Sequence, residues 1–198
     1  MLEQPVNTGE LGMNIQVSLG VIHCPEHAQT AEDLFRRMSI LLDAARIQQQ
    51  ILPYDEKLDK QYQRRLTVIT ELEKVLIENK DELSLHYQPK INLISGKVES
   101  VEALLRWHSP ILGFVPPDEF IALAEHAGFI GQITEWVISR AIKDISYFQD
   151  AEVNLSVSVN LSAQDIINAE ILEKITQHLR KQKVDAHHFA IEITESDL

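Results

Sequence analysis

The pattern of hydrophobic and polar positions divides the chain into two regions that predict different elements. In the first region, residues 14–22 have the pattern of a strand, and residues 31–47 carry apolar side chains at helical spacing. Those apolar side chains are Leu34, Met38, Leu41, Leu42 and Ala45. The polar stretch that follows contains Pro53, and we expect the preceding helix to end before it.

A second helix is predicted from about Glu56 to Lys80, because one face of this stretch is apolar and the other faces are charged. The apolar face comprises Leu66, Ile69, Leu72, Val75 and Leu76. We predict that this helix is the junction between two structural units.

From Leu83 onward, predicted strands alternate with predicted helices. The strands are 83–93, 98–107, 154–161 and 188–195, and the helices are 117–127, 130–149 and 163–182. Such alternation is typical of an α/β fold with a mostly parallel sheet.

Two of these strands have one bulky apolar face and one small or polar face. Leu155, Val157 and Val159 alternate with Ser156, Ser158 and Asn160, and Phe189, Ile191 and Ile193 alternate with Ala190, Glu192 and Thr194. Because successive side chains of a strand point to opposite faces, we expect helices to cover the bulky apolar set. The polar set would then face the interior of a closed barrel.

The same parity groups the polar residues of the other strands. Glu102, Leu104 and Arg106 share one face, and His86, Gln88 and Lys90 share one face. Asn160 and Glu192 fall near the carboxyl ends of their strands, which lie at the mouth of a barrel. We therefore expect Glu102, Asn160 and Glu192 to converge from three different strands.

Two carboxylates and an amide oxygen are hard ligands, which suit Mg²⁺ or Mn²⁺ better than zinc. Arg106 on the face of Glu102 could hold a phosphate in bidentate fashion. A metal and an arginine that face an anionic ligand favour phosphate-ester chemistry. From spacing alone, the same residues also fit a plain interpretation as exposed charges and a strand-end asparagine.

The charge balance excludes some partners. Thirty acidic and eighteen basic side chains give a formal charge of −12, which disfavours binding to a nucleic-acid polymer. We find no apolar run of about 18 residues and no signal peptide, so we expect no membrane contact within this chain. Cys24 is the single cysteine, which fits a reducing compartment, and we expect a cytoplasmic location, with a membrane anchor elsewhere in the parent protein left open.

Five motifs follow one another along the second region. They are YQPKINL at 87–93, VEALLRW at 101–107, GFVPPDEFIALAEHAG at 113–128, VSVNLSAQDI at 157–166 and IEITES at 191–196. In order and spacing they resemble the first half of the EAL family, the bacterial cyclic di-GMP phosphodiesterases, over about residues 66–198. The resemblance implies a modified TIM barrel whose first strand is antiparallel to its neighbours. It also implies hydrolysis of cyclic di-GMP to pGpG that depends on Mg²⁺ or Mn²⁺.

The resemblance also assigns roles to individual residues. The metal ligands of the family match Glu102, Asn160 and Glu192. Its substrate contacts match Gln88 at the guanine and Leu104 and Arg106 near the base and phosphate. Glu195 matches a glutamate that steadies a substrate- and metal-binding loop, so we count Glu102 and Glu195 as the catalytic residues.

The first region resembles the end of a GGDEF domain, the diguanylate cyclase domain that commonly precedes EAL. VSLGVIH at 17–23 and the helical stretch at 31–50 match its C-terminal strand and last helix, although the helix departs from the family pattern. We therefore predict a degenerate α+β GGDEF remnant at 1–54, a linking helix at 55–80 and the first half of an EAL barrel at 81–198.

A complete barrel of eight βα units needs about 250 residues, and the later EAL motifs fall beyond Leu198 in the family order. We therefore expect the isolated chain to be poorly stable or self-associating, with an open strand edge and no phosphodiesterase activity. Two alternatives to an enzyme remain open. One is an inactive receptor for cyclic di-GMP, and the other is a scaffold that forms a homodimer through the EAL domain or the linking helix. The presence of Glu102, Asn160 and Glu192 favours the enzyme.

Overall fold

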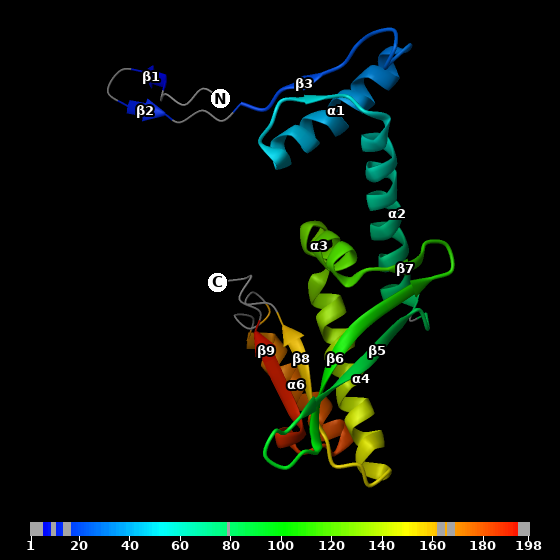
Figure 1. Cartoon of the computed structure of the whole chain (residues 1–198), viewed down its shortest axis with the longest axis vertical. Helices are drawn as coiled ribbons and strands as arrows, with labels where there is room; N and C mark the ends of the chain where they lie inside the picture. Colours follow the sequence, from blue (N-terminus) through cyan, green and yellow to red (C-terminus); the bar gives the residue numbers. More distant parts are fainter. Residues whose placement is uncertain are drawn as a thin grey trace. The chain divides into compact units, whose positions relative to one another are not determined.

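The computed structural model describes residues 6–8, 11–13, 17–78, 80–161, 165 and 169–193 (Figure 1). The chain forms two compact units, Met1–Thr67 and Val68–Leu198. The division falls within helix α2 (Glu56–Glu78), so the predicted junction helix contributes residues to both units.

The first unit has short strands and one long helix. Strand β1 (Val6–Thr8) pairs antiparallel with β2 (Leu11–Met13), and β3 (Gly20–Val21) pairs parallel with β4 (Leu52–Pro53). The strand predicted at 14–22 is therefore much shorter where it is described, and residues 14–16 lie outside the described part. Its length is limited by β4, which offers only two residues for pairing.

Thr30 is the N-cap of helix α1 (Ala31–Gln48), and its side chain accepts a hydrogen bond from the Asp33 backbone N–H over 3.1 Å. Leu41 and Ala45 are fully buried, but Met38 and Leu42 are 40% exposed, so the predicted apolar stripe is only partly correct. The buried face contacts β3 at a glycine. A Cβ at Gly20 would lie 2.7 Å from the Leu41 side chain, so only glycine permits this approach.

The second unit is built on a sheet in the order β5-β6-β8-β9, with β7 paired to β6 (Figure 1). Its strands are β5 (Leu83–Ile91), β6 (Val98–Ser109), β7 (Gly113–Val115), β8 (Ser156–Leu161) and β9 (Phe189–Ile193). The pairs β6–β8 and β8–β9 are parallel, whereas β5 is antiparallel to β6. This confirms the α/β fold and the antiparallel first strand, and it is consistent with part of a TIM barrel. Strand β7 was not predicted, because three residues carry too little alternation to be recognised.

The helices of this unit are α3 (Pro117–Ala127), α4 (Ile130–Asp150) and α6 (Ala169–Gln182), with a 3₁₀ turn η1 (Ala186–His188) before β9. Pro117 occupies the first turn of α3, and Gly128 ends the helix with φ +81°. The predictions of helices at 117–127 and 130–149 are thus confirmed to within one residue. The helix predicted from 163 is described at residue 165 and from 169 onward.

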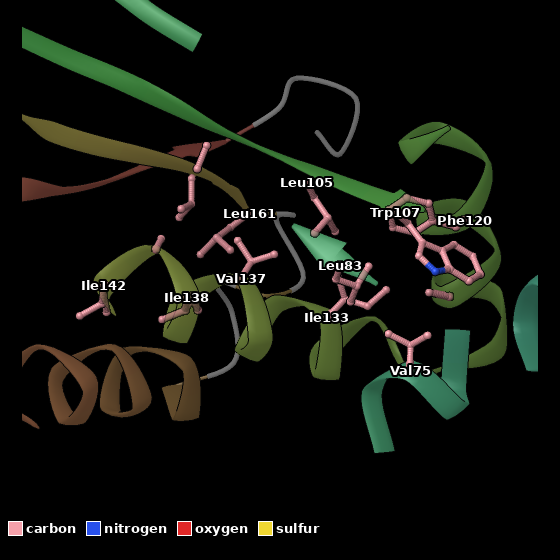
Figure 2. Close-up of a cluster of buried hydrophobic side chains, with 14 of the residues drawn as sticks. Val75, Leu83, Leu105, Trp107, Phe120, Ile133, Val137, Ile138, Ile142 and Leu161 are labelled. Carbon is pink, nitrogen blue, oxygen red and sulfur yellow. The ribbon is translucent and has the colours of Figure 1, made fainter. Parts of the chain in front are cut away.

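The core of this unit lies between the sheet and its helices (Figure 2). Along β6 the odd-numbered residues Val101, Ala103, Leu105 and Trp107 are buried, and they face the apolar side of α4 and α3. The Trp107 ring meets the Phe120 ring edge-on at 5.6 Å between centroids, and its Nε1 donates to Glu82 over 3.2 Å. The helix-covered face is therefore set by the parity of β6.

The bulky face of β9 departs from the prediction. Val157 and Val159 of β8 are fully buried, but Ile191 and Ile193 of β9 are 36% and 55% exposed. Within the described residues β9 pairs on one side only, with β8, and so it receives less cover than β8 does. In the part of the chain that the structure describes, no helix has the length and apolar character needed to cross a membrane.

The buried face of α4 gives a direct test of this core. Ile142 is fully buried and Ile94 is 99% exposed, so the two isoleucines form a matched pair. We expect Ile142→Ala to lower the free energy of unfolding by about 2–5 kcal/mol, because it leaves a cavity. We expect Ile94→Ala to change it by less than about 0.5 kcal/mol. Urea unfolding followed by circular dichroism measures both, and equal effects would contradict this placement of the core.

Candidate functional site

The face of the sheet opposite the helices carries the polar residues that the sequence analysis grouped together. Cross-strand register places Glu102 of β6 beside Gln88 of β5 and beside Ser158 of β8. Two residues further along β8, Asn160 lies beside Glu192 of β9. These residues come from four strands, so sheet pairing brings them together.

Hydrogen bonds and ion pairs connect this polar face. Asn160 Nδ2 donates to Glu102 Oε1 over 2.7 Å. The Lys90 ammonium group donates to Ser158 Oγ over 3.0 Å, forms an ion pair with Glu192, and lies 4.0 Å from Glu102 Oε2. Both carboxylates of the predicted metal site therefore contact the same lysine. The sequence analysis placed Lys90 on a polar face but gave it no role.

The contact between Lys90 and Glu192 requires a curved sheet. Lys90 is on β5 and Glu192 is on β9, which are the two ends of the strand order β5-β6-β8-β9. With neighbouring strands about 4.8 Å apart, a flat sheet would separate them by about 14 Å. The sheet must therefore curl towards its polar face, as the wall of a barrel does.

The lysine also changes the ionisation of the acidic residue. The hydrogen bond from Lys90, followed by one from Ser158, lowers the pKa of Glu192 below its usual value and outweighs partial burial. Ser158 is only 5% exposed, so its hydroxyl is a buried group of β8 beneath the two carboxylates. The contacts with Lys90 and Ser158 thus favour the ionised form of Glu192.

Strand β5 is anchored on its opposite face. The Tyr87 hydroxyl donates to Asp144 Oδ2 over 2.7 Å, and Arg140 Nε donates to the same carboxylate over 3.1 Å. Burial, followed by the hydrogen bond to Asp144, raises the pKa of Tyr87 well above its usual value. Because Tyr87 lies directly before Gln88, this bond to α4 fixes the part of β5 that contributes to the polar face.

A cavity of about 540 Å³ opens beside the polar face. Leu104, Arg106 and Asn160 line it together with residues of α3 and α4. The Arg106 Nη1 donates to the Leu105 carbonyl over 2.8 Å, which holds the guanidinium close to β6. The volume falls within the usual range for a small-molecule site.

The predicted site residues thus fall into groups. Glu102, Asn160 and Glu192 form the polar cluster, while Leu104 and Arg106 line the cavity that Asn160 shares. Gln88 is exposed and lies beside Glu102, away from the cavity lining. The predicted catalytic Glu195 lies outside the described residues.

The donor set fits a hard divalent cation. Within the described ranges, no group of three or more His, Cys, Asp or Glu side chains could hold a metal ion. The neighbouring side chain with a further oxygen donor is Asn160, whose Nδ2 donates to Glu102. Three oxygen donors suit Mg²⁺ or Mn²⁺, and the Lys90 ammonium shows that positive charge is accepted between the carboxylates.

Comparison with known proteins gives a consistent family match. Residues 70–198 match the model of the EAL domain. The whole chain is 32% identical to the cyclic di-GMP phosphodiesterase PdeR of Escherichia coli strain K12, of which it covers 30%. Over 98% of its length it is 29% identical to the bifunctional diguanylate cyclase/cyclic di-GMP phosphodiesterase MucR of Pseudomonas aeruginosa, of which it covers 29%.

Solved structures agree with this match. The PaMucR phosphodiesterase in complex with c-di-GMP is similar with a TM-score of 0.60 and 34% sequence identity. The similarity covers 65% of this chain and 52% of that chain. This chain thus spans less than a third of these two curated relatives and about half of the solved domain.

The ion pair between Lys90 and Glu192 predicts a pH dependence of stability. A carboxyl group whose pKa is lower in the folded state stabilises the fold above its unfolded pKa, and this contribution is lost as the pH falls through the folded pKa. We expect the melting temperature of the original chain to exceed that of Glu192→Gln at neutral pH, and the difference to shrink as the pH falls below about 4.3, the usual pKa of glutamate. With Lys90→Met in both proteins, the difference should shrink at every pH. A difference that grows on acidification would contradict the ion pair.

Proposed function

This chain belongs to the EAL domain family, and on that premise we propose that it is part of a bacterial GGDEF–EAL signalling protein that hydrolyses cyclic di-GMP to pGpG. One observation carries the proposal. Glu102, Asn160 and Glu192 meet on one face of the sheet, beside a cavity lined by Arg106. The cyclic di-GMP in the complex of PaMucR phosphodiesterase supports this ligand class.

We propose that Glu102, Asn160 Oδ1 and Glu192 hold Mg²⁺ or Mn²⁺. When bound, such a cation supplies an activated water and neutralises charge on the phosphate. Asn160 Nδ2 already donates to Glu102, which orients one metal-binding carboxylate. The protein's contribution on this proposal is therefore to place Glu102, Asn160 and Glu192 on the adjoining strands β6, β8 and β9.

The substrate-binding role falls to residues at the cavity and beside it. Arg106 presents a guanidinium suited to bidentate contact with a phosphate of the dinucleotide. Leu104 offers an apolar surface for a base on the same face, and Gln88 beside Glu102 offers an amide for the guanine edge. Glu195 is proposed to steady a loop at the site.

The alternative is a receptor that binds cyclic di-GMP without hydrolysing it. The observation that favours this alternative is the Lys90 ammonium between the two carboxylates, because a positive charge already stands where a metal is needed. The presence of all three oxygen donors favours the enzyme. Hydrolysis by a protein that contains this chain within a complete EAL domain separates the two functions.

We also propose that residues 1–54 are the end of a degenerate GGDEF domain. The alignments with PdeR and MucR extend over 100% and 98% of this chain, and therefore upstream of the EAL match. The relative MucR is bifunctional, with both the cyclase and the phosphodiesterase activity in its name.

Substitutions test the enzyme in a protein that contains this chain within a complete EAL domain. We expect Glu102→Ala to lower kcat for pGpG formation by at least about 10²-fold, because a metal ligand is lost. We expect Arg106→Ala chiefly to raise KM, because it removes a phosphate contact. The matched control is Glu99→Ala, whose carboxylate binds Asn92 and Ser95 on the β5–β6 hairpin. Normal hydrolysis by Glu102→Ala would refute the assignment.

The chain by itself offers a second test. Three oxygen donors are fewer than the six that Mg²⁺ takes, so water must fill the remaining positions and affinity must be low. We expect calorimetry to show Mg²⁺ binding weaker than about 0.1 mM, since only two carboxylates contribute. Chromatography should detect no pGpG after incubation with cyclic di-GMP. Submicromolar Mg²⁺ affinity or product formation by residues 1–198 would contradict the expectation that these three donors form only part of the site.

A further inference from the structure

Lys90 contacts the polar cluster, but the proposed reaction gives this lysine no role. Its ammonium group touches Ser158 and Glu192 and lies within 4.0 Å of Glu102. These contacts reach from β5 to β8 and β9, so the lysine side chain crosses the polar face of the sheet. No residue adjacent in sequence to Lys90 takes part in these contacts.

The charges around Lys90 explain why this arrangement is stable. Two carboxylates on one face repel each other unless a cation lies between them. The ammonium group supplies one positive charge to both, and Asn160 Nδ2 adds a hydrogen bond to Glu102. The carboxylates that would bind a divalent cation are thus the ones that the lysine already contacts.

We propose that Lys90 is the internal counter-ion of the acidic pair, and that a divalent cation must displace its ammonium group to bind Glu102 and Glu192. The inference rests on the metal site proposed above. Lys90 is then a positioning residue that sets the metal affinity of the site. It holds the two carboxylates in place while no metal is bound and opposes the metal that replaces it.

The chemistry of lysine suits a displaceable counter-ion. Its ammonium is a compact, strongly hydrated charge on a flexible four-carbon stem, whereas an arginine would hold a carboxylate in a rigid two-bond fork. The Lys90 side chain is 40% exposed, so it has access to solvent when it leaves the carboxylates. The ammonium can therefore withdraw into water without a change in the backbone of β5.

The test is a titration of the whole chain with Mn²⁺ in the absence of nucleotide. Electron paramagnetic resonance measures the Mn²⁺ that remains free at each step. We expect Lys90→Met to lower the Kd for Mn²⁺ by about tenfold, because one competing charge close to the carboxylates is lost. Lys90→Gln tests the same loss of charge with a polar side chain if the methionine variant is insoluble. We expect Lys90→Arg to leave the Kd within about threefold of the original or to raise it, because its charge remains.

Two control variants separate local displacement from a general effect of charge. Lys97→Met removes one positive charge from the β5–β6 hairpin, and within the described residues Lys97 makes no ion pair with Glu102 or Glu192. We expect it to change the Kd by less than about twofold, because salt screens a distant exposed charge. Lys90→Met combined with Glu192→Gln should lose the gain in affinity, because the carboxylate that Lys90 leaves free for the metal is then missing.

Thermal melting gives an independent readout. Since a ligand that binds only the folded state stabilises it in proportion to ln(1 + [L]/Kd), Mn²⁺ should raise the melting temperature of Lys90→Met more than that of the original chain. An unchanged or weaker Mn²⁺ affinity in Lys90→Met, or no binding in either protein, would overturn the inference. Because no nucleotide is present, failure of cyclic di-GMP hydrolysis in the proposed enzyme would not alter this result.

Discussion

The alternation of side chains along β6 is the constraint on which the rest of the second unit depends. Val101, Ala103, Leu105 and Trp107 enter the core, so Glu102, Leu104 and Arg106 must face the other way. A slip of one residue would place a carboxylate and a guanidinium under α3 and α4, where burial of charge is costly. Core packing therefore selects the face on which the polar site is built. Trp107 stabilises this register of β6, because its ring packs against Phe120 and its Nε1 donates to Glu82.

Curvature adds what parity alone cannot provide. Parity places the carboxylates on one face, but only a curled sheet brings β5 close enough to β9 for Lys90 to reach Glu192. Tyr87 supports this geometry from the other side, because its hydroxyl is bonded to Asp144 of α4. The bond from Tyr87 to α4 thus links the helix-covered side of the sheet to the strand that carries Lys90. Loss of the Tyr87–Asp144 hydrogen bond should therefore weaken the contact between Lys90 and Glu192, because Lys90 lies three residues further along the same strand.

The sequence predicted most accurately those features that depend on local physics. Pro117 and Gly128 mark the ends of α3, and strand parity predicted the shared face of Glu102 and Arg106. It did not reveal that Lys90 meets Glu192, because the distance between β5 and β9 depends on long-range curvature that a local pattern does not contain. The same limit applies to the prediction of buried apolar residues. The pattern placed Ile191, Ile193 and Met38 on buried faces, but all three side chains are exposed. An alternating or periodic pattern identifies a face, but the cover that this face receives is decided by tertiary packing.

The charge in the polar cluster links the fold to the proposed chemistry. An ammonium group carries one charge and gains from the two carboxylates it touches, whereas a divalent cation carries two charges and gains from every oxygen donor around it. Each further oxygen donor that reaches the site therefore favours the metal over Lys90. With Glu102, Asn160 and Glu192 as the proposed donors, we expect Lys90 to compete with the metal, because it contacts both carboxylates. On this proposal, metal occupancy depends on how completely the oxygen shell is assembled, and Lys90 lowers the occupancy that a given set of donors can reach.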